Sequence, residues 1–278
     1  MSTKGTKTKI ALNLLLLIGI LAIIYYLINQ SFADIFAELL STSLVVIVAA
    51  LVLGTLYQLV EGRSIKEIAE PFANDFSTID GFWTSCYIAF YRIVSFGTGT
   101  LISEIYFYNK KGMKFSQGAG VTALHMIMYK LAVITYAIIG LIVQFSLFYS
   151  KGPSMIWFII AGIVLTGLII AFLLLISISL NLQIFFVSVS NKLFKSQRLR
   201  KWVDTCNTQI YSLRETVQTI VKDRTALLRI YFWNMLKLLF WYVMPYIFLV
   251  ENHPNIDFLL TFSFISFAVV LSGVIPTP

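Results

Sequence analysis

The stretch AGVTALHMIMYKLAVITYAIIGLIVQF, residues Ala119–Phe145, decides the fold class of this chain. It contains one charged residue, Lys130, and it exceeds the roughly 20 helical residues that cross about 30 Å of hydrocarbon. Other apolar runs long enough to cross are Ile10–Ile28, Leu44–Val60, Ile156–Leu182 and Ile230–Val250. None of them alternates apolar and polar residues as a barrel strand does. The sequence therefore predicts an all-α protein, a polytopic bundle of transmembrane helices forming a single domain over residues 1–278.

The composition agrees with a membrane environment. Hydrophobic residues make up 58% of the chain and charged residues only 12%. Soluble domains contain about 25% charged residues, so a water-exposed surface of this size would lack ionic groups. The net charge is +8, and the basic residues flank apolar runs. This placement favours anionic membrane lipid over nucleic acid as their partner.

Motifs of soluble enzymes and metal sites are missing from the sequence. It has no Walker A loop, no GxSxG elbow and no dinucleotide-binding glycine motif. The cysteines Cys86 and Cys206 and the histidines His125 and His253 have no metal-ligand spacing. The sequence therefore predicts no metal, no cofactor and no catalytic residue, and it leaves open whether the protein is an enzyme.

The distribution of Lys and Arg predicts the orientation in the membrane. Lysines precede the first apolar run, and the loop that follows it, residues 29–43, has no basic residue. Arg63 and Lys66 follow the second run. These positions predict a cytoplasmic N-terminus. The first run is longer than the core of about 7–15 residues in a signal peptide, which predicts an uncleaved helix; a signal peptide is the alternative.

The apolar run Phe82–Phe107 conflicts with this charge rule if it crosses the membrane fully. It would place three lysines outside, namely Lys110, Lys111 and Lys114. Its centre contains residues that permit a sharp turn and that bond freed backbone groups, namely Gly97, Thr98, Gly99 and Thr100. The sequence therefore predicts a re-entrant helical hairpin opening to the cytoplasm. The alternative is an ordinary helix followed by a loop that violates the rule.

A second interrupted run closes the chain. Phe258–Ile275 is apolar and is followed by Pro276, Thr277 and Pro278, which would stop a helix inside the membrane. Two broken helices that enter from opposite faces are typical of inverted-repeat transporters. The abrupt ending predicts that the domain is truncated at its C-terminus.

Between these elements, residues 188–228 form a basic, amphipathic segment that the charge rule places in the cytoplasm. Its apolar residues recur at spacings of three and four, namely Leu199, Trp202, Cys206, Ile210, Leu213, Val217 and Ile220. This spacing predicts one apolar face of a helix. Such a helix either lies on an anionic membrane surface or packs against the cytoplasmic ends of the bundle.

Charged residues inside the apolar runs are the candidate functional residues. Each costs about 2.5–3.5 kcal/mol at mid-membrane on insertion scales, so each needs a partner or a role. Arg92, Glu104 and Lys130 are predicted to bind a lipid head group, with an Arg92–Glu104 ion pair across the hairpin as the alternative. Lys237 is predicted to snorkel to the interface, and His125 is predicted to be a satisfied histidine packed in the bundle.

Two motifs resemble the lysylphosphatidylglycerol synthase transmembrane-region family, the flippase-like domain of the multiple peptide resistance factor and its stand-alone relatives. The broken-helix motif is Ser95-Phe96-Gly97-Thr98-Gly99-Thr100, followed by the Lys-Lys-Gly-containing segment Glu104–Met113. The terminal Ser272–Pro278 resembles the second motif of the family. The chain departs from the family at two positions, because no proline precedes Phe96 and Glu104 stands where relatives often have Gln.

The resemblance implies a bacterial cell-membrane protein that moves an aminoacylated phospholipid or a glycolipid between leaflets, and resistance to cationic peptides through that transport. The implied partners are a membrane phospholipid and a lipid-modifying enzyme. One alternative is the membrane part of a phosphatidylglycerol lysyltransferase that lacks its soluble catalytic domain here. Another is a non-transporting scaffold for a lipid enzyme.

Overall fold

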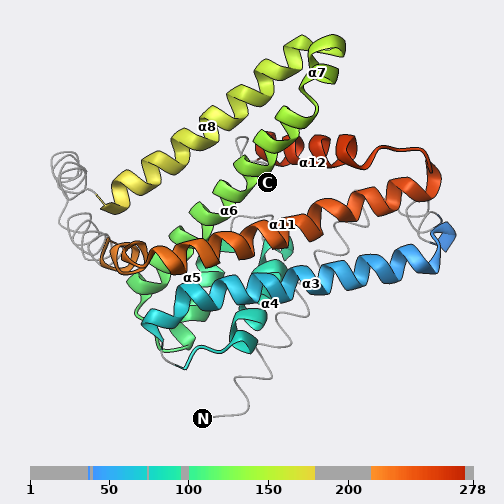
Figure 1. Ribbon diagram of the computed structural model, residues 1–278. Coiled ribbons are helices and arrows are strands. Elements are labelled where there is room, and N and C mark those ends of the chain that lie inside the picture. The colour runs from blue at the N-terminus through green and yellow to red at the C-terminus, as the bar shows by residue number, and fades with distance from the viewer. Residues whose placement is uncertain (1–36, 38–39, 74, 95–99, 179–213, 273–278) are drawn as a thin grey trace.

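A computed structural model describes residues 37, 40–73, 75–94, 100–178 and 214–272 of the chain. Within these residues the regular structure is helical and no strand occurs (Figure 1). The elements are α3 (Leu44–Ala69), the 3₁₀ turn η1 (Glu70–Phe72), α4 (Thr78–Val94), α5 (Thr100–Lys110), α6 (Phe115–Val143), α7 (Phe145–Lys151), α8 (Pro153–Ile178), α11 (Arg224–Asn252) and α12 (Phe258–Ser272). Residues 214–222 are also helical.

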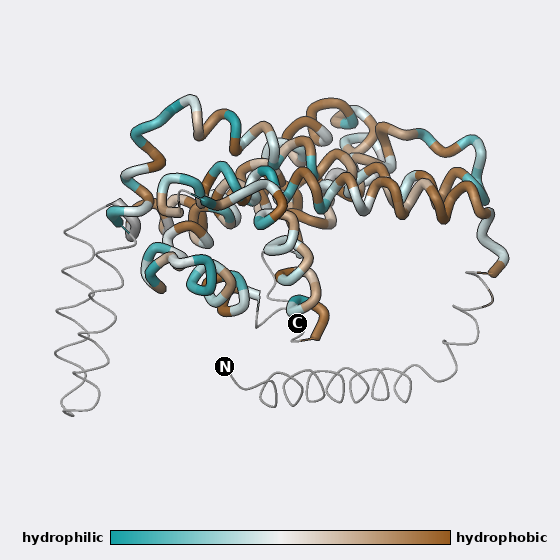
Figure 2. Tube along the Cα trace, turned by 90° about the horizontal axis from the view of Figure 1, so that it is seen from below, coloured by the Kyte–Doolittle hydropathy of each residue, from teal (hydrophilic) through white to brown (hydrophobic). Residues whose placement is uncertain are grey.

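Four of the described helices are long and apolar enough to cross a membrane. They cover Leu44–Phe72, Phe115–Val143, Ser154–Phe172 and Arg224–Asn252. Four of the predicted spans are therefore confirmed as long apolar helices of an all-α bundle, and the run Ile10–Ile28 lies outside the described residues. Apolar residues extend along much of these helices (Figure 2), and large side chains such as Leu44, Val45, Trp157 and Phe158 are exposed, as expected for lipid-facing surfaces.

Helix boundaries follow from local capping chemistry. The Ser43 side chain accepts a hydrogen bond from the Val46 backbone N–H at 3.4 Å at the start of α3. Asp223 accepts from the backbone N–H groups of Thr225 and Ala226, both at 3.0 Å, at the start of α11. Gly112, between α5 and α6, has φ of 90°, a left-handed conformation that favours glycine. These caps satisfy N–H groups that a helix terminus leaves without partners.

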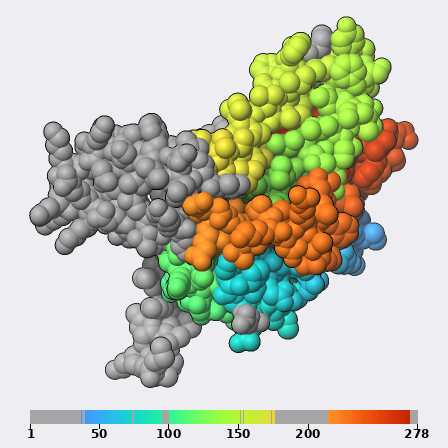
Figure 3. Space-filling view, turned by 60° about the vertical axis from the view of Figure 1, so that its left-hand side comes forward, coloured from blue at the N-terminus to red at the C-terminus, as the bar shows by residue number. Residues whose placement is uncertain are grey.

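Helices α3 and α11 lie side by side along their length (Figures 1 and 3). Helix α4 packs on α3 at a close backbone approach between two glycines, Gly62 and Gly81. A Cβ at Gly62 would lie 2.5 Å from the Phe82 backbone nitrogen, and a Cβ at Gly81 would overlap the Gly62 carbonyl oxygen. Only glycine at these positions lets the two helices approach so closely.

Helix α6 crosses the bundle and joins two cores (Figure 1). One core lies between α3, α4, α5, α6 and α11 and includes Ile65, Tyr108 and Leu124. The other lies between α6, α7, α8, α11 and α12 and includes Tyr242 and Phe267. Side chains on the two halves of a single helix therefore meet different partners.

Helices α4 and α5 fold back on each other around the predicted break. The Lys111 ammonium, just after α5, pairs with the Asp80 carboxylate near the start of α4, and the rings of Tyr87 and Phe107 are 5.5 Å apart. Thr100 begins α5, whereas Gly97, Thr98 and Gly99 lie outside the described residues, as do Pro276 and Pro278. Re-entry of this hairpin into the membrane stays a prediction.

The amphipathic segment is described only at its C-terminal end. In residues 214–222, Val217 and Ile220 are buried, and Ile220 belongs to the same core as Leu124. Thr216 lies close to Gly120 of α6, because a Cβ added at Gly120 would lie 2.6 Å from the Thr216 side chain. This part of the segment therefore packs against the bundle, which is one of the two predicted alternatives.

Candidate functional site

Four ionisable side chains meet inside the bundle and form what we call the buried charge cluster. They are Glu61 of α3, Glu104 of α5, His125 of α6 and Lys237 of α11, and their exposed fractions are 6%, 3%, 8% and 1%. Each comes from a different helix, so the cluster joins four elements at one point. Buried charges that lack partners are strongly destabilising, so their contacts define the site.

His125 bridges the two carboxylates. Its Nδ1 lies 3.1 Å from Oε1 of Glu104. Its Nε2 lies 3.1 Å from Oε1 of Glu61, at an angle outside ordinary hydrogen-bond geometry. The Lys237 ammonium contacts the other oxygen of Glu61. The imidazole ring therefore has a carboxylate oxygen close to each nitrogen.

Aromatic and polar neighbours complete the cluster. The Tyr108 hydroxyl donates a hydrogen bond to Glu104 at 2.9 Å, and the Lys237 ammonium lies 5.0 Å from the centroid of the Tyr129 ring. One turn before Lys237, Asn234 donates to the Ser64 hydroxyl at 2.8 Å. These contacts fix the positions of the charged groups, because a buried polar network is rigid when its members are paired.

A cavity of about 360 Å³ opens beside the cluster. Its lining residues include all four members of the cluster together with Arg92, Lys130 and Thr122. Thr122 is only 3% exposed, and its hydroxyl has no hydrogen-bond partner among the described residues. A buried hydroxyl without a partner at a cavity wall is a position where a ligand oxygen would be stabilised.

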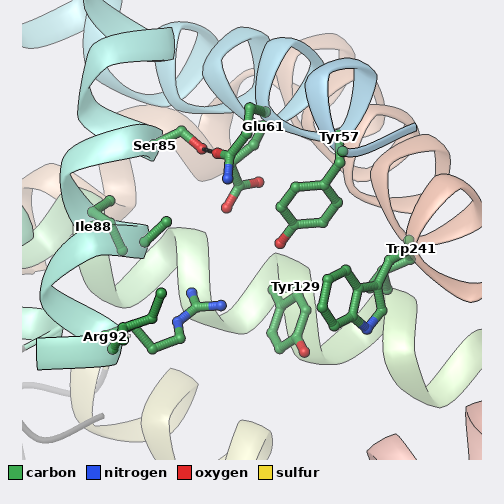
Figure 4. A pocket seen from close by; sticks show the side chains of 12 residues that line it. Tyr57, Glu61, Ser85, Ile88, Arg92, Tyr129 and Trp241 are labelled. Atoms are coloured by element: carbon green, nitrogen blue, oxygen red, sulfur yellow. Dashed lines mark hydrogen bonds between the residues drawn. The ribbon is translucent and has the colours of Figure 1, made fainter. Parts of the chain in front are cut away.

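A second cavity of about 330 Å³ adjoins the first. Both are lined by the same five residues, namely Tyr57, Glu61, Ile88, Arg92 and Tyr129. The remaining wall of the second cavity is largely apolar and includes Ile93, Leu238 and Trp241. Figure 4 shows the Arg92 guanidinium and the Tyr57 hydroxyl pointing into this space. Charged side chains therefore line both cavities, and the second extends to apolar side chains.

The structure places the three predicted head-group residues, Arg92, Glu104 and Lys130, on one cavity. Their role in binding stays a prediction. No ion pair among the described residues joins Arg92 to Glu104, whose carboxylate instead contacts Tyr108 and His125. The alternative of a simple Arg92–Glu104 pair across the hairpin is therefore wrong.

Two further predictions concern the other polar residues of the spans. The prediction that Lys237 snorkels is wrong, because its side chain is buried and pairs with Glu61. His125 is buried in the bundle as predicted, but it contacts carboxylates from two other helices.

Glu61 was missed because it follows the apolar run that ends at Val60 and resembles a loop charge. A usable signal was present, since polar residues recur every three positions on this helix at Gln58, Glu61, Ser64 and Glu67. Such spacing predicts a polar stripe on one helix face.

The cluster is not arranged as a metal centre. No group of three His, Cys, Asp or Glu side chains in the described part of the chain is placed to hold a metal ion. Both nitrogens of His125 face carboxylates, and the Lys237 ammonium supplies positive charge next to Glu61. The arrangement is suited to binding charged groups and protons.

Comparisons with known proteins leave the family open. No family model, no curated protein and no solved structure matches this chain. The site itself consists of two adjoining cavities, both lined in part by charged side chains, inside a bundle of membrane-span-like helices.

Proposed function

We propose that the protein moves a phospholipid, such as phosphatidylglycerol or its aminoacylated form, or a phosphate-bearing glycolipid, between the two leaflets of a membrane. The observation that supports this most strongly is the joined pair of cavities. The first is lined by charged side chains, and the second shares Glu61 and Arg92 with it and extends to Ile93, Leu238 and Trp241. A phospholipid likewise joins a charged head group to apolar chains.

The charge of the first cavity favours an anionic head group. Its basic lining residues are Arg92, Lys130 and Lys237, and its acidic ones are Glu61 and Glu104. With a neutral His125, these three positive and two negative formal charges leave one positive charge in excess. A phosphate oxygen would supply the missing negative charge and would accept hydrogen bonds from Arg92 and from the unpaired Thr122 hydroxyl.

The acidic residues also fit an aminoacylated head group. Glu104 and Glu61 line the same cavity as Arg92, so a ligand with both a phosphate and an ammonium group finds charges of both signs. The volume of about 360 Å³ lies within the range of roughly 300–1,000 Å³ usual for ligand pockets. The cavity suits a head group rather than a whole lipid.

The pair of helices α4 and α5 supports movement through this site. Arg92 and Glu104 lie on opposite sides of the segment that separates the two helices. Broken helices near the membrane midplane line the substrate site in many secondary transporters. Here the two broken-helix residues line the same cavity as Lys130 and Lys237 of the long helices α6 and α11.

The test is lipid exchange between leaflets in vesicles containing the purified chain. A fluorescent, acyl-labelled phosphatidylglycerol is distributed in both leaflets, and a membrane-impermeant quencher added outside reports how quickly the inner pool becomes accessible. We expect the wild type to accelerate exchange over protein-free vesicles. Arg92→Ala and Glu104→Ala should reduce the rate by about tenfold or more, since a lost charge-assisted hydrogen bond costs about 1.5–3 kcal/mol.

Matched controls replace basic residues outside the cavity. Arg224 and Lys222 are exposed and lie at the start of α11 and just before it. Arg224→Ala is the matched control for Arg92→Ala, and Lys222→Ala is a second control for loss of a basic side chain. Exchange that is fast in all variants would contradict the site. A wild type that does not accelerate exchange would contradict transport, and would favour a scaffold for a lipid enzyme.

A further inference from the structure

We infer that His125 is a proton-binding site, and that one proton moves with each anionic lipid. This inference rests on the proposed function and adds the co-transported ion and the energy source. The geometry that supports it is the placement of one imidazole between two carboxylates, Glu61 and Glu104, inside the bundle.

The hydrogen-bonding capacity of histidine provides the first step. A neutral imidazole has one N–H donor and one lone pair, whereas an imidazolium has two donors. His125 has a carboxylate oxygen 3.1 Å from each nitrogen. A neutral ring would leave a lone pair beside one of these carboxylates, whereas the protonated ring donates a hydrogen bond to Glu104 and makes an ionic contact with Glu61.

The charge count provides the second step. In the cluster, Glu61 and Glu104 contribute two negative charges and Lys237 contributes one positive charge. Protonation of His125 makes these four groups neutral, and Arg92 and Lys130, which line the same cavity, then leave it with two positive charges. An uncompensated buried charge is costly, so the protonated site favours binding of an anionic phosphate and loss of the proton favours its release.

Other elements packed on α6 do not change this count. Helices α8 and α12 have no ionisable side chain. The ionisable groups of helix 214–222 are Arg214, Glu215 and Lys222, and those of α7 are Tyr149 and Lys151; none of these lines the cavity. The groups that face the cavity near His125 come from α3, α4, α5, α6 and α11, and they are Tyr57, Glu61, Arg92, Glu104, Tyr129, Lys130 and Lys237.

Coupling to the lipid follows from the shared cavity. His125 lines the same space as Arg92 and Lys130, so its positive charge adds to the attraction for a phosphate. The phosphate in turn favours the protonated ring, because each ligand strengthens binding of the other. On loading, a proton from water bonds to the free lone pair of one ring nitrogen. On release, that N–H bond breaks and the proton returns to water on the opposite side with the lipid.

The test uses the full chain in phosphatidylcholine vesicles with the same labelled phosphatidylglycerol. Potassium and valinomycin hold the membrane potential at zero, and the outer pH is set one unit below or equal to the inner pH. With one proton per lipid, the ratio of probe between leaflets should shift by up to about tenfold per pH unit. When a protonophore is added, this ratio should return to the value that it has without a pH gradient.

The chain provides a matched pair of histidine variants. His125→Gln cannot bind a proton at this position; it should exchange the probe more slowly than the wild type and should reach the same leaflet ratio with and without the pH gradient. His253→Gln replaces the other histidine, which is exposed at the end of α11, and should accumulate the probe like the wild type. Glu104→Gln removes one of the two carboxylates that contact the His125 ring and should weaken accumulation of the probe. It serves as a second test if His125→Gln does not fold.

The outcomes separate the two proposals. Wild-type exchange with no accumulation under the gradient overturns the proton coupling and leaves lipid transport standing. Accumulation that persists in folded His125→Gln also overturns it. A wild type that exchanges no probe at either pH overturns the proposed function and with it this inference. The wild-type experiment with and without the protonophore decides the coupling even if no variant folds.

Discussion

The two halves of α6 lie in regions of opposite character. Up to Lys130 the helix faces the buried charge cluster, where His125 contacts carboxylates from α3 and α5. Beyond it the helix faces rings and small residues. Tyr136 packs against Tyr242 and Phe262 with centroids 5.4 and 5.3 Å apart, and Gly140 lies against Ser263 and Ser266 of α12.

The difference separates residues that packing explains from residues that it does not. The aromatic region is stabilised by close contact, and edge-to-face ring pairs of this kind contribute about 0.5–1.5 kcal/mol beyond area burial. The charged region gains no comparable advantage, because buried ion pairs are often replaceable by apolar residues without loss of stability. The proposed binding of a charged ligand or a proton would account for charges at this position.

The largest expected effect is the loss of one partner of the central ion pair. Glu61→Ala leaves Lys237 buried without its carboxylate, and breaking a buried pair costs about 3–5 kcal/mol. We expect a loss of that size in unfolding free energy, measured by denaturant titration in mixed micelles. The double variant Glu61→Gln/Lys237→Met should be less destabilised than Glu61→Ala, because no charge is then left unpaired.

Glu70→Gln is the control for this comparison. Glu70 is exposed and pairs with Lys66 at 3.4 Å on the surface of the same helix, where an ion pair contributes only about 0–1 kcal/mol. A loss from Glu70→Gln as large as that from Glu61→Ala would show that the buried cluster has no special place in the stability of the bundle.

A smaller effect is expected from filling the close approach of α3 and α4. Gly62→Ala forces its Cβ against the Phe82 backbone at 2.5 Å, and overpacking of this kind costs about 1–3 kcal/mol. The change should also shift Arg92 and lower lipid exchange. Thermal unfolding and the vesicle assay measure the two consequences.

Gly167→Ala in α8 is the matched substitution. A Cβ at Gly167 meets no atom within 4 Å, and alanine is favoured over glycine in a helix interior by about 1 kcal/mol. We expect Gly167→Ala to be neutral or stabilising. Equal destabilisation by both substitutions would contradict the close α3–α4 contact.

Two buried tyrosines allow the same substitution in both regions. Tyr108 donates to Glu104 at 2.9 Å, whereas the Tyr242 hydroxyl has no hydrogen-bond partner in the described part of the chain. Tyr108→Phe should lose about 2 kcal/mol, since a hydrogen bond to a charged group contributes about 1.5–3 kcal/mol. Tyr242→Phe should be neutral or slightly stabilising. Denaturant titrations that rank the two variants in the reverse order would contradict the assigned contacts.

The smallest effect is expected at the surface pair of the α4–α5 hairpin. The hydrogen bond from Lys111 holds the pKa of the Asp80 carboxyl below its ordinary value of 3.8. A carboxyl whose pKa is lowered in the folded state stabilises the protein when the pH is above the ordinary pKa. This contribution is lost as the pH falls through the lowered pKa. Asp80→Asn should therefore cost about 0.2–1 kcal/mol at neutral pH and less in acid.

Melting temperatures at neutral pH and below the ordinary aspartate pKa measure this difference. Asp75→Asn changes an exposed aspartate in the loop that precedes α4 and should leave the melting temperature unchanged. A penalty for Asp80→Asn that grows as the pH falls would contradict the pairing with Lys111.

The sequence predicted the helical spans well and the site only in part. The predicted apolar runs that begin at Leu44 and Phe258 start at the first residues of α3 and α12. Such spans can be predicted because length and hydropathy are properties of a local segment. Arg92, Glu104 and Lys130 stood out as charges within apolar runs, and they line one cavity. Lys237 was misread because a long side chain seven residues into an apolar run can reach the interface, and Glu61 was missed because it follows the end of a run, where a charge usually reaches water.

The sequence by itself determined that most of this chain suits the apolar environment of a membrane, because the hydrophobicity of a helix is the sum over its residues. What only the tertiary structure decided is which charges meet. Glu61 and Lys237 are 176 positions apart, and His125 and Glu104 come from different helices. Their contacts depend on how each helix is rotated and packed, and no local pattern in the sequence determines that rotation.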